Sequence, residues 1–187
     1  MRRGFKAEAE RRAIAARERL GLAPTAPICP WVFAEALGVI VFPADELDLE
    51  PEHAAQLLHR DPDSWSGMTL FDEGEHVVVL NSTHKRTRQS ATLMHEIAHI
   101  TLHHVPADVT VSPSGIVLLS DYSAEQEDEA DWLGAALLLP EPMLLQERGR
   151  GLSISAIANA FGVSEALCQW RCRMTGIEKR LALRARA

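Results

Sequence analysis

The sequence predicts an α+β fold, with helices packed against a small three-stranded sheet. Apolar residues make up 47% of the 187 residues and charged residues 24%, a balance typical of a globular protein that buries a core. Helical segments come first, three short apolar segments of strand length follow, and helical segments occupy most of the second half. This order is typical of a fold whose helices and strands are segregated along the chain.

The first part of the chain is predicted to form two helices and one strand. Residues 6–20 are strong helix formers followed by Gly21, a residue favoured just beyond helix C-termini. Pro30 suits the first turn of a second helix, which we expect to end at Gly38. Residues 39–42 then form a short apolar run ended by a proline, which predicts a buried strand.

The next part is predicted to form a β-hairpin. Residues 44–66 are acidic, with a helix predicted over 51–59. Residues 67–71 and 76–80 are two apolar runs, and the Asp-Glu-Gly-Glu sequence between them is a turn signal. We therefore expect the two runs to pair as antiparallel strands, and the earlier strand to complete the sheet.

The remainder of the chain is predicted to be helical apart from one loop. Its elements, in order, are a long helix from residue 82 or 83 to residue 104, a loop over 105–122, a helix over 123–139, a hinge at 149–151, and two short helices over 153–161 and 164–174. The two short helices flank a tight turn and resemble a helix-turn-helix. We therefore divide the chain into a main domain, residues 1–148, and a C-terminal helical extension packed on it, residues 149–187.

One helical segment carries the pattern of a metal site. His95 and His99 are four residues apart, about 400° around a helix, so both imidazoles lie on one face, one turn apart. Two imidazole nitrogens presented in this way can bind one Zn²⁺. Glu96 lies about 100° around the helix from His95. It is therefore poorly placed as a ligand and well placed to take a proton from a water molecule at the metal.

A third ligand is expected from the following helix, which begins with several acidic residues. Glu127 and Asp131 lie on one face of that helix, one turn apart. The small residues Ala130 and Gly134 lie on the same face and allow close approach to the histidine helix. Glu127 then points to the metal, and Asp131 can hydrogen-bond the far nitrogen of a ligating imidazole. Glu129 points about 200° around the helix from Glu127 and is the alternative third ligand.

Three further residues are candidates for secondary roles. His103 and His104 lie too far along the helix from His95 to bind the same ion, so we expect them to be exposed or to contact the ligands. Tyr122, the only tyrosine, and these two histidines are candidates to stabilise a developing oxyanion. The alternative for Tyr122 is a packing role in the loop.

Charge and cysteine content exclude several classes of protein. The formal net charge is −7, with basic excess confined to residues 1–20 and 165–187, which argues against an extended nucleic-acid footprint. Three cysteines are too few for a disulfide framework, and Cys168 and Cys172 are expected to be packing thiols. The sequence shows no apolar run long enough to cross a membrane and no secretion signal. We therefore expect a cytoplasmic, bacterial-type protein without a membrane partner.

These motifs, in this order, resemble those of the ImmA/IrrE-type metallo-endopeptidases. The resembling segments are residues 31–42, which end in LGVIVF, the hairpin ending in Val79-Leu80-Asn81, RQSATLMHEIAHITLHH at 88–104, EDEADWLGAALLLP at 127–140, and the tail at 153–176. The chain departs from the family pattern at packing positions, such as Leu133 and Leu139, where the family often has Phe and Met.

The resemblance implies a zincin-like helical core and a zinc site made by His95, His99 and Glu127, with Glu96 as the catalytic base. It also implies the substrate, because members of the family usually cleave an XRE-type helix-turn-helix transcriptional repressor once. That cleavage relieves repression in stress responses or in mobile-element induction. We expect the substrate to lie extended along the free edge of the hairpin.

Two alternatives come from other functional classes. The first is a metal-stabilised regulatory or DNA-binding protein that does not cleave its partner. The second is a toxin-like member of a two-gene pair. We do not expect direct DNA binding by the C-terminal helices, because the family's own C-terminal helices account for their sequence pattern.

Overall fold

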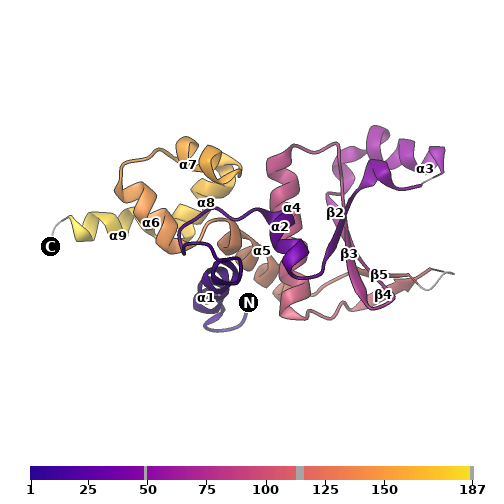
Figure 1. The fold of residues 1–187 in the computed structure, drawn as a ribbon, viewed down its shortest axis with the longest axis horizontal. Helices are drawn as coiled ribbons and strands as arrows, with labels where there is room; N and C mark the ends of the chain where they lie inside the picture. The colour runs from indigo at the N-terminus through magenta and orange to yellow at the C-terminus, as the bar shows by residue number, and fades with distance from the viewer. Residues whose placement is uncertain (49, 113–115, 186–187) are drawn as a thin grey trace.

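The computed structural model describes residues 1–48, 50–112 and 116–185. The helices are α1 (Phe5–Arg19), α2 (Pro30–Ala36), α3 (Pro51–Ala55), α4 (Arg86–Leu102), α5 (Ala124–Leu138), α6 (Glu141–Gly149), α7 (Ile154–Phe161), α8 (Glu165–Thr175) and α9 (Ile177–Arg184), with short helical turns η1 (Ala44–Glu46), η2 (Gln56–Arg60) and η3 (Pro62–Ser64). The strands are β1 (Ile40–Pro43), β2 (Gly67–Asp72), β3 (Glu75–Leu80), β4 (Asp108–Val111) and β5 (Val117–Ser120). Figure 1 shows the sheet at one end of the molecule, the C-terminal helices at the other, and α4 and α5 between them.

The α+β class is confirmed, but the predicted strand number is wrong. Within the described ranges the sheet has five strands in the order β1-β3-β2-β5-β4. The predicted hairpin is confirmed, because β2 and β3 pair antiparallel from Gly67 opposite Leu80 to Asp72 opposite Glu75. β1 runs parallel to β3, and the other neighbouring strands are antiparallel.

The two additional strands come from the segment that we expected to be a loop. Prolines favoured a loop there, yet β4 and β5 form a second hairpin, with Val111 opposite Val117. β5 also pairs with β2, beginning at Thr69 opposite Leu119. From Thr69 to Phe71 the hairpin of β2 and β3 therefore has no free edge, so the substrate cannot lie along the whole edge as we expected from the sequence. The outer strands are β1 and β4.

The strand predicted as buried is instead a half-exposed edge strand. The strand β1 begins at Ile40 and pairs with β3 alone among the described strands. Ile40 is 37% exposed and Phe42 is 39% exposed. An apolar run predicts burial, but an outer position in the sheet leaves one edge open to solvent.

Helices cover both faces of the central strands. Alternate side chains of a strand point to opposite faces. Val78 and Leu80 of β3 belong to the main core with residues of α4, whereas Val79 packs in a smaller cluster with Leu58 of η2. Because β2 pairs with β3, it is held against α4. The first residues of β2 lie beside the middle of that helix.

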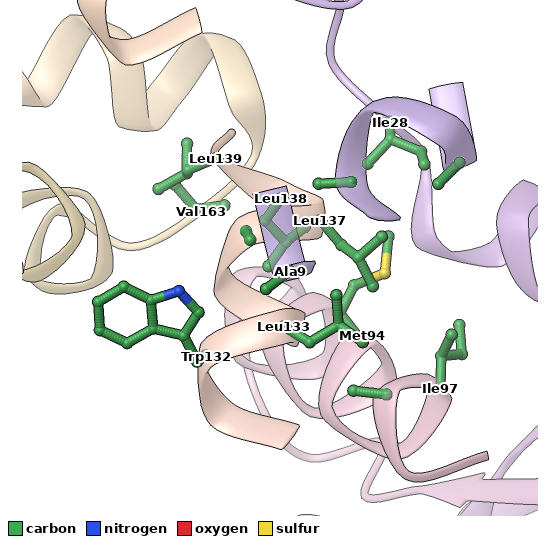
Figure 2. Close-up of a cluster of buried hydrophobic side chains, with 14 of the residues drawn as sticks. Ala9, Ile28, Met94, Ile97, Trp132, Leu133, Leu137, Leu138, Leu139 and Val163 are labelled. Atoms are coloured by element: carbon green, nitrogen blue, oxygen red, sulfur yellow. The ribbon is translucent and has the colours of Figure 1, made fainter. Parts of the chain in front are cut away.

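The main core is built by α1, α4 and α5. Figure 2 shows Leu133 and Leu137 of α5 pointing toward Met94 of α4, while Trp132 points in the other direction. Trp132 meets Trp170 of α8 edge-on, with ring centroids 5.7 Å apart. α5 therefore packs on the histidine helix with one face and on the C-terminal helices with another.

The histidine helix begins later than predicted, at Arg86 rather than at residue 82 or 83. The side-chain oxygen of Asn81 accepts hydrogen bonds from the backbone N–H of Thr83 at 3.0 Å and from its hydroxyl at 2.6 Å. This side-chain turn competes with helix formation immediately after β3. The predicted helix over 123–139 is confirmed as α5, with Ser123 as its N-cap.

The C-terminal helices are linked to the first helix by an ion pair between a buried arginine and a partly buried glutamate. Arg171 of α8 is fully buried, pairs with Glu10 of α1, and donates to the carbonyl oxygen of Leu139 at 3.1 Å. The other carboxylate oxygen of Glu10 accepts from the backbone N–H of Glu141 at 2.9 Å. One carboxylate thus links α1, α6 and α8. The division of the chain at residue 148 remains a prediction.

None of the helices in the described part of the chain is both long and apolar enough to span a membrane.

Candidate metal centre

The two histidines of the His-Glu-x-x-His pattern face each other from consecutive turns of α4. Their Nε2 atoms lie 3.0 Å apart, and the ring centroids are 4.7 Å apart. His99 is 1% exposed, whereas the side chain of His95 is 24% exposed. The helical spacing therefore brings both imidazoles to one point, as the sequence predicted.

Glu127 is the carboxylate that α5 brings to the two imidazoles. Its Oε2 lies 3.2 Å from Nε2 of His95, and its Oε1 lies 3.6 Å from Nε2 of His99. Glu127 lies in the first turn of α5, which a capping box of Ser123 and Gln126 fixes. The alternative ligand Glu129 lies elsewhere, buried against Arg2.

These three residues fit a zinc ion. One donor atom from each of His95, His99 and Glu127 lies within 4.8 Å of the others. Two imidazoles and one carboxylate form a donor set found in catalytic zinc sites, where a fourth position stays open. The donor atoms converge in the cleft between α4, α5 and the sheet, so the set is both chemically suitable and accessible.

Gly134 sets the distance between the two helices that supply the ligands. A Cβ atom at this position would lie 3.1 Å from the backbone nitrogen of His95 and 3.1 Å from the carbonyl of Met94. Both contacts are with backbone, which cannot rotate away. Close approach of α5 to α4 therefore depends on this glycine.

Gly134→Ala should destabilise the protein and weaken zinc binding. Overpacking costs about 1–3 kcal/mol, and the helix preference for alanine returns about 1 kcal/mol, so we expect a net loss of about 1 kcal/mol. Urea unfolding measures the stability and chelator competition measures the zinc affinity. Gly149→Ala is the matched control, because its Cβ would meet only Leu181 at an ordinary 3.5 Å. Equal effects of the two variants would contradict the role of Gly134.

Asp131 supports His95 from the next turn of α5. The Nδ1–H of His95 donates to Oδ1 of Asp131 at 2.9 Å, which leaves Nε2 as the metal-facing nitrogen. Burial alone would lower the pKa of His95, but the hydrogen bond to Asp131 and the charges of Glu96 and Glu127 raise it. The same hydrogen bond lowers the pKa of Asp131, which is 72% exposed at the side chain.

Zinc affinity should fall as the pH drops below the raised pKa of His95. Below that pKa His95 carries a proton, which must leave before the ring can bind a metal. His99 adds nothing to this dependence above its own pKa, because burial and the nearby His95 and His104 lower that pKa to about 3. Competition titrations between about pH 5 and pH 8 measure the effect. One released proton predicts about a tenfold loss per pH unit on the acidic side; an affinity independent of pH would contradict the prediction.

Glu96 lies beside the ligands and is held by the sheet. The hydroxyl of Thr69 in β2 donates to Oε2 of Glu96 at 2.5 Å. Burial raises the pKa of Glu96, although Thr69 and His95 oppose the shift. A carboxylate with a raised pKa is a stronger proton acceptor. The sequence did not indicate Thr69, which is placed by the alternation of β2 side chains toward α4.

The three candidates for secondary roles lie at different distances from the centre. His103 is exposed at the end of α4, whereas the ring of His104 contacts His99 with their Nδ1 atoms 3.1 Å apart. Tyr122 stacks on His99 with ring centroids 3.8 Å apart. Burial raises the pKa of Tyr122 to about 12, and Glu96 and Glu127 add to the shift. The Tyr122 hydroxyl therefore stays protonated and is a potential donor.

The three ligands line one hollow of a cleft, and a second hollow shares part of its lining. One hollow of about 340 Å³ has apolar walls from Trp65, Met68, Leu118, Leu119 and Tyr122. The other, of about 360 Å³, has polar walls that include Ser66, Thr92 and Asp131. Gly67, His95 and Glu96 line both hollows. The apolar wall could not be predicted, because three of its five residues belong to the segment expected to be a loop.

The β2 strand contributes backbone to this cleft. Among the described pairs, β2 meets β5 only from Thr69 onward, while Gly67 and Met68 pair with β3. No described strand pairs with them on the β5 side, and both residues line the cleft. An extended segment can therefore pair with these two residues, which is a shorter stretch than the whole hairpin edge expected from the sequence.

Residues 57–173 match the family model Peptidase_M78, described as the IrrE N-terminal-like domain. The match covers more than half of the chain and includes the strands β2 and β3, the helices α4 and α5, and every residue of the metal centre. A search of curated proteins found no match.

Proposed function

Because the chain belongs to the Peptidase_M78 family of metal-dependent peptidases, as its resemblance to the ImmA/IrrE-type enzymes predicted, we propose that it is a zinc-dependent endopeptidase that cleaves a helix-turn-helix transcriptional repressor. One observation carries the proposal. The donor atoms of His95, His99 and Glu127 converge within 4.8 Å, with the carboxylate of Glu96 alongside.

Each residue of the centre has a separate task in this proposal. A zinc ion held by His95, His99 and Glu127 would supply a Lewis acid and lower the pKa of a water molecule. Glu96 accepts the proton of the attacking water and passes it to the leaving amine. Tyr122 is the proposed donor to the oxyanion, because its hydroxyl stays protonated and its ring lies against His99 in the same cleft.

The shape of the cleft favours an endopeptidase. The hollow lined by the three ligands shares Gly67, His95 and Glu96 with a second hollow, so the cleft has room for a polypeptide that continues beyond the bond that is cut. The backbone of Gly67 and Met68 is available to hold such a segment extended. The apolar wall suits an apolar side chain on one side of that bond.

The proposal of a repressor as substrate rests on the family and not on a contact in this chain. The helix-turn-helix appearance of α7 and α8 does not favour the DNA-binding alternative. The helix α8 begins with Glu165, whose carboxylate accepts from the Ser155 hydroxyl at 2.7 Å, and it buries Arg171 and Cys172 in the protein. An acidic first residue and a buried arginine are unfavourable for binding phosphate.

Incubation with the XRE-type repressor encoded nearest to this chain tests the proposal. The zinc-loaded protein should cut the repressor at one position, seen as two fragments by mass spectrometry. A chelator should abolish the cleavage and added zinc should restore it. Cleavage of other proteins but not of the repressor would remove the proposed substrate and leave the endopeptidase. Chelator-sensitive binding without cleavage would instead favour the regulatory alternative.

A further inference from the structure

The buried ligand His99 is supported differently from His95. Its Nε2 faces His95 and Glu127, and its Nδ1 lies 3.1 Å from Nδ1 of His104. If Nε2 supplies the lone pair for a metal, Nδ1 carries the proton and donates it to His104. A second imidazole therefore takes the place that a carboxylate, Asp131, takes for His95.

A helix-ending turn brings His104 back to the ligand. His103 adopts a left-handed conformation, with φ of 54°. The backbone N–H of His103 donates to the carbonyl oxygen of Ile100, and that of His104 donates to the carbonyl oxygen of His99, both at 3.1 Å. These two bonds define a Schellman motif. The motif reverses the chain after α4 and points the His104 ring at His99.

The second nitrogen of His104 faces the buried carboxylate of Glu129. Nε2 of His104 lies 3.6 Å from Oε2 of Glu129, an electrostatic contact longer than a good hydrogen bond. Glu129 is 3% exposed and accepts from the backbone N–H of Arg2 at 2.8 Å and from its guanidinium at 2.9 Å. Arg2 thus compensates the buried charge.

His99, His104 and Glu129 form a series of contacts, and the metal at one end and the carboxylate at the other determine which nitrogens carry protons. An ionised carboxylate only accepts, so Nε2 of His104 carries a proton toward Glu129, and Nδ1 of His104 is free to accept from His99. Each nitrogen then has one role, and the metal-facing nitrogen of His99 is fixed as Nε2.

We propose that His104 and Glu129 are positioning residues, which orient the imidazole of His99 and select the nitrogen that it presents to the metal. Arg2 holds Glu129 in place. The proposal rests on the proposed zinc site, and it concerns the affinity and geometry of that site rather than the cleavage reaction.

Zinc affinity and the visible spectrum of the cobalt-loaded full-length chain test this proposal. His104→Leu should weaken zinc binding about 10–100-fold, the usual effect of losing a partner of a metal-ligating histidine, and should change the cobalt absorption bands. His104→Gln should retain most of the affinity, because its amide oxygen accepts and its amide nitrogen donates. The controls are His103→Asn, at the neighbouring exposed histidine, and Asp128→Asn, at an exposed carboxylate one residue from Glu129.

Each failure has a distinct meaning. If the unaltered chain does not bind zinc, the proposed function fails as well. If it binds zinc and His104→Leu has the same affinity and spectrum, the positioning role is overturned. Equal losses in His104→Leu and His104→Gln would also overturn it. If His104→Leu does not fold, Glu129→Gln decides, because the proposal requires weaker zinc binding there and unchanged binding contradicts it.

Discussion

Glu96→Gln should nearly abolish cleavage while leaving zinc bound. Glutamine has the shape of glutamate and can accept the hydrogen bond that Thr69 donates, so the cleft should keep its structure. It cannot take a proton, and loss of a general base typically lowers kcat about 10²–10⁴-fold. Zinc content by metal analysis and fragment formation by mass spectrometry measure the two quantities separately.

The control for Glu96→Gln is Glu125→Gln, which removes the same charge from an exposed residue two positions before Glu127. We expect this control to cleave at the rate of the unaltered protein. Cleavage retained in Glu96→Gln would remove Glu96 from the mechanism, even with zinc in place.

Arg171→Ala should lower the free energy of unfolding by about 3–5 kcal/mol, because it removes a fully buried side chain and breaks its ion pair with the partly buried Glu10. The variant leaves the carboxylate of Glu10 without its guanidinium and the carbonyl oxygen of Leu139 without a donor. It also removes the cation 5.2 Å from the ring of Trp132. Urea unfolding followed by circular dichroism measures the loss.

Arg173→Ala, on an exposed position of the same helix, is the matched control and should change stability little. Combining Arg171→Met with Glu10→Gln should recover part of the loss, because no unpaired charge then remains buried. We also expect the whole chain to unfold in one transition. A loss below about 1 kcal/mol for Arg171→Ala, within the range of surface substitutions, would contradict the role given to the ion pair.

The parts of the centre that follow from local spacing could be predicted from the sequence. Residues four apart on a helix share a face, which brings His95 and His99 together. The same rule on the next helix favoured Glu127 over Glu129 and put Asp131 within reach of an imidazole. The structure has this arrangement because Gly134 lets the two helices meet closely.

The contacts between distant segments could not be predicted in this way. Arg2 and Glu129 are 127 residues apart, so their contact depends on how α1 packs on α5. The place of His104 depends on a single left-handed residue, His103, where the sequence has no glycine to indicate it. The contact of Thr69 with Glu96 depends on the register of β2, which a shift of one residue would reverse.

The second hairpin shows a conflict between two local signals. Pro106 and Pro113 favoured a loop, and they outweighed the β-branched residues Val109 and Val111 and the apolar residues of β5. Two such runs separated by a short sequence with a proline and a glycine are also a hairpin signal. Pairing of β5 with β2 stabilises these short strands. That pairing cannot be predicted from the sequence of this segment alone.

The short open stretch of β2 at Gly67 and Met68 has a consequence for how cleavage positions are chosen. A chain laid beside them would turn its successive side chains alternately toward and away from the histidine helix. A slip by one residue would exchange the two sets, whereas a slip by two would restore them. We therefore expect substitutions at every second residue of a substrate to change the cleavage rate strongly. Substitutions at the residues between them should change it little.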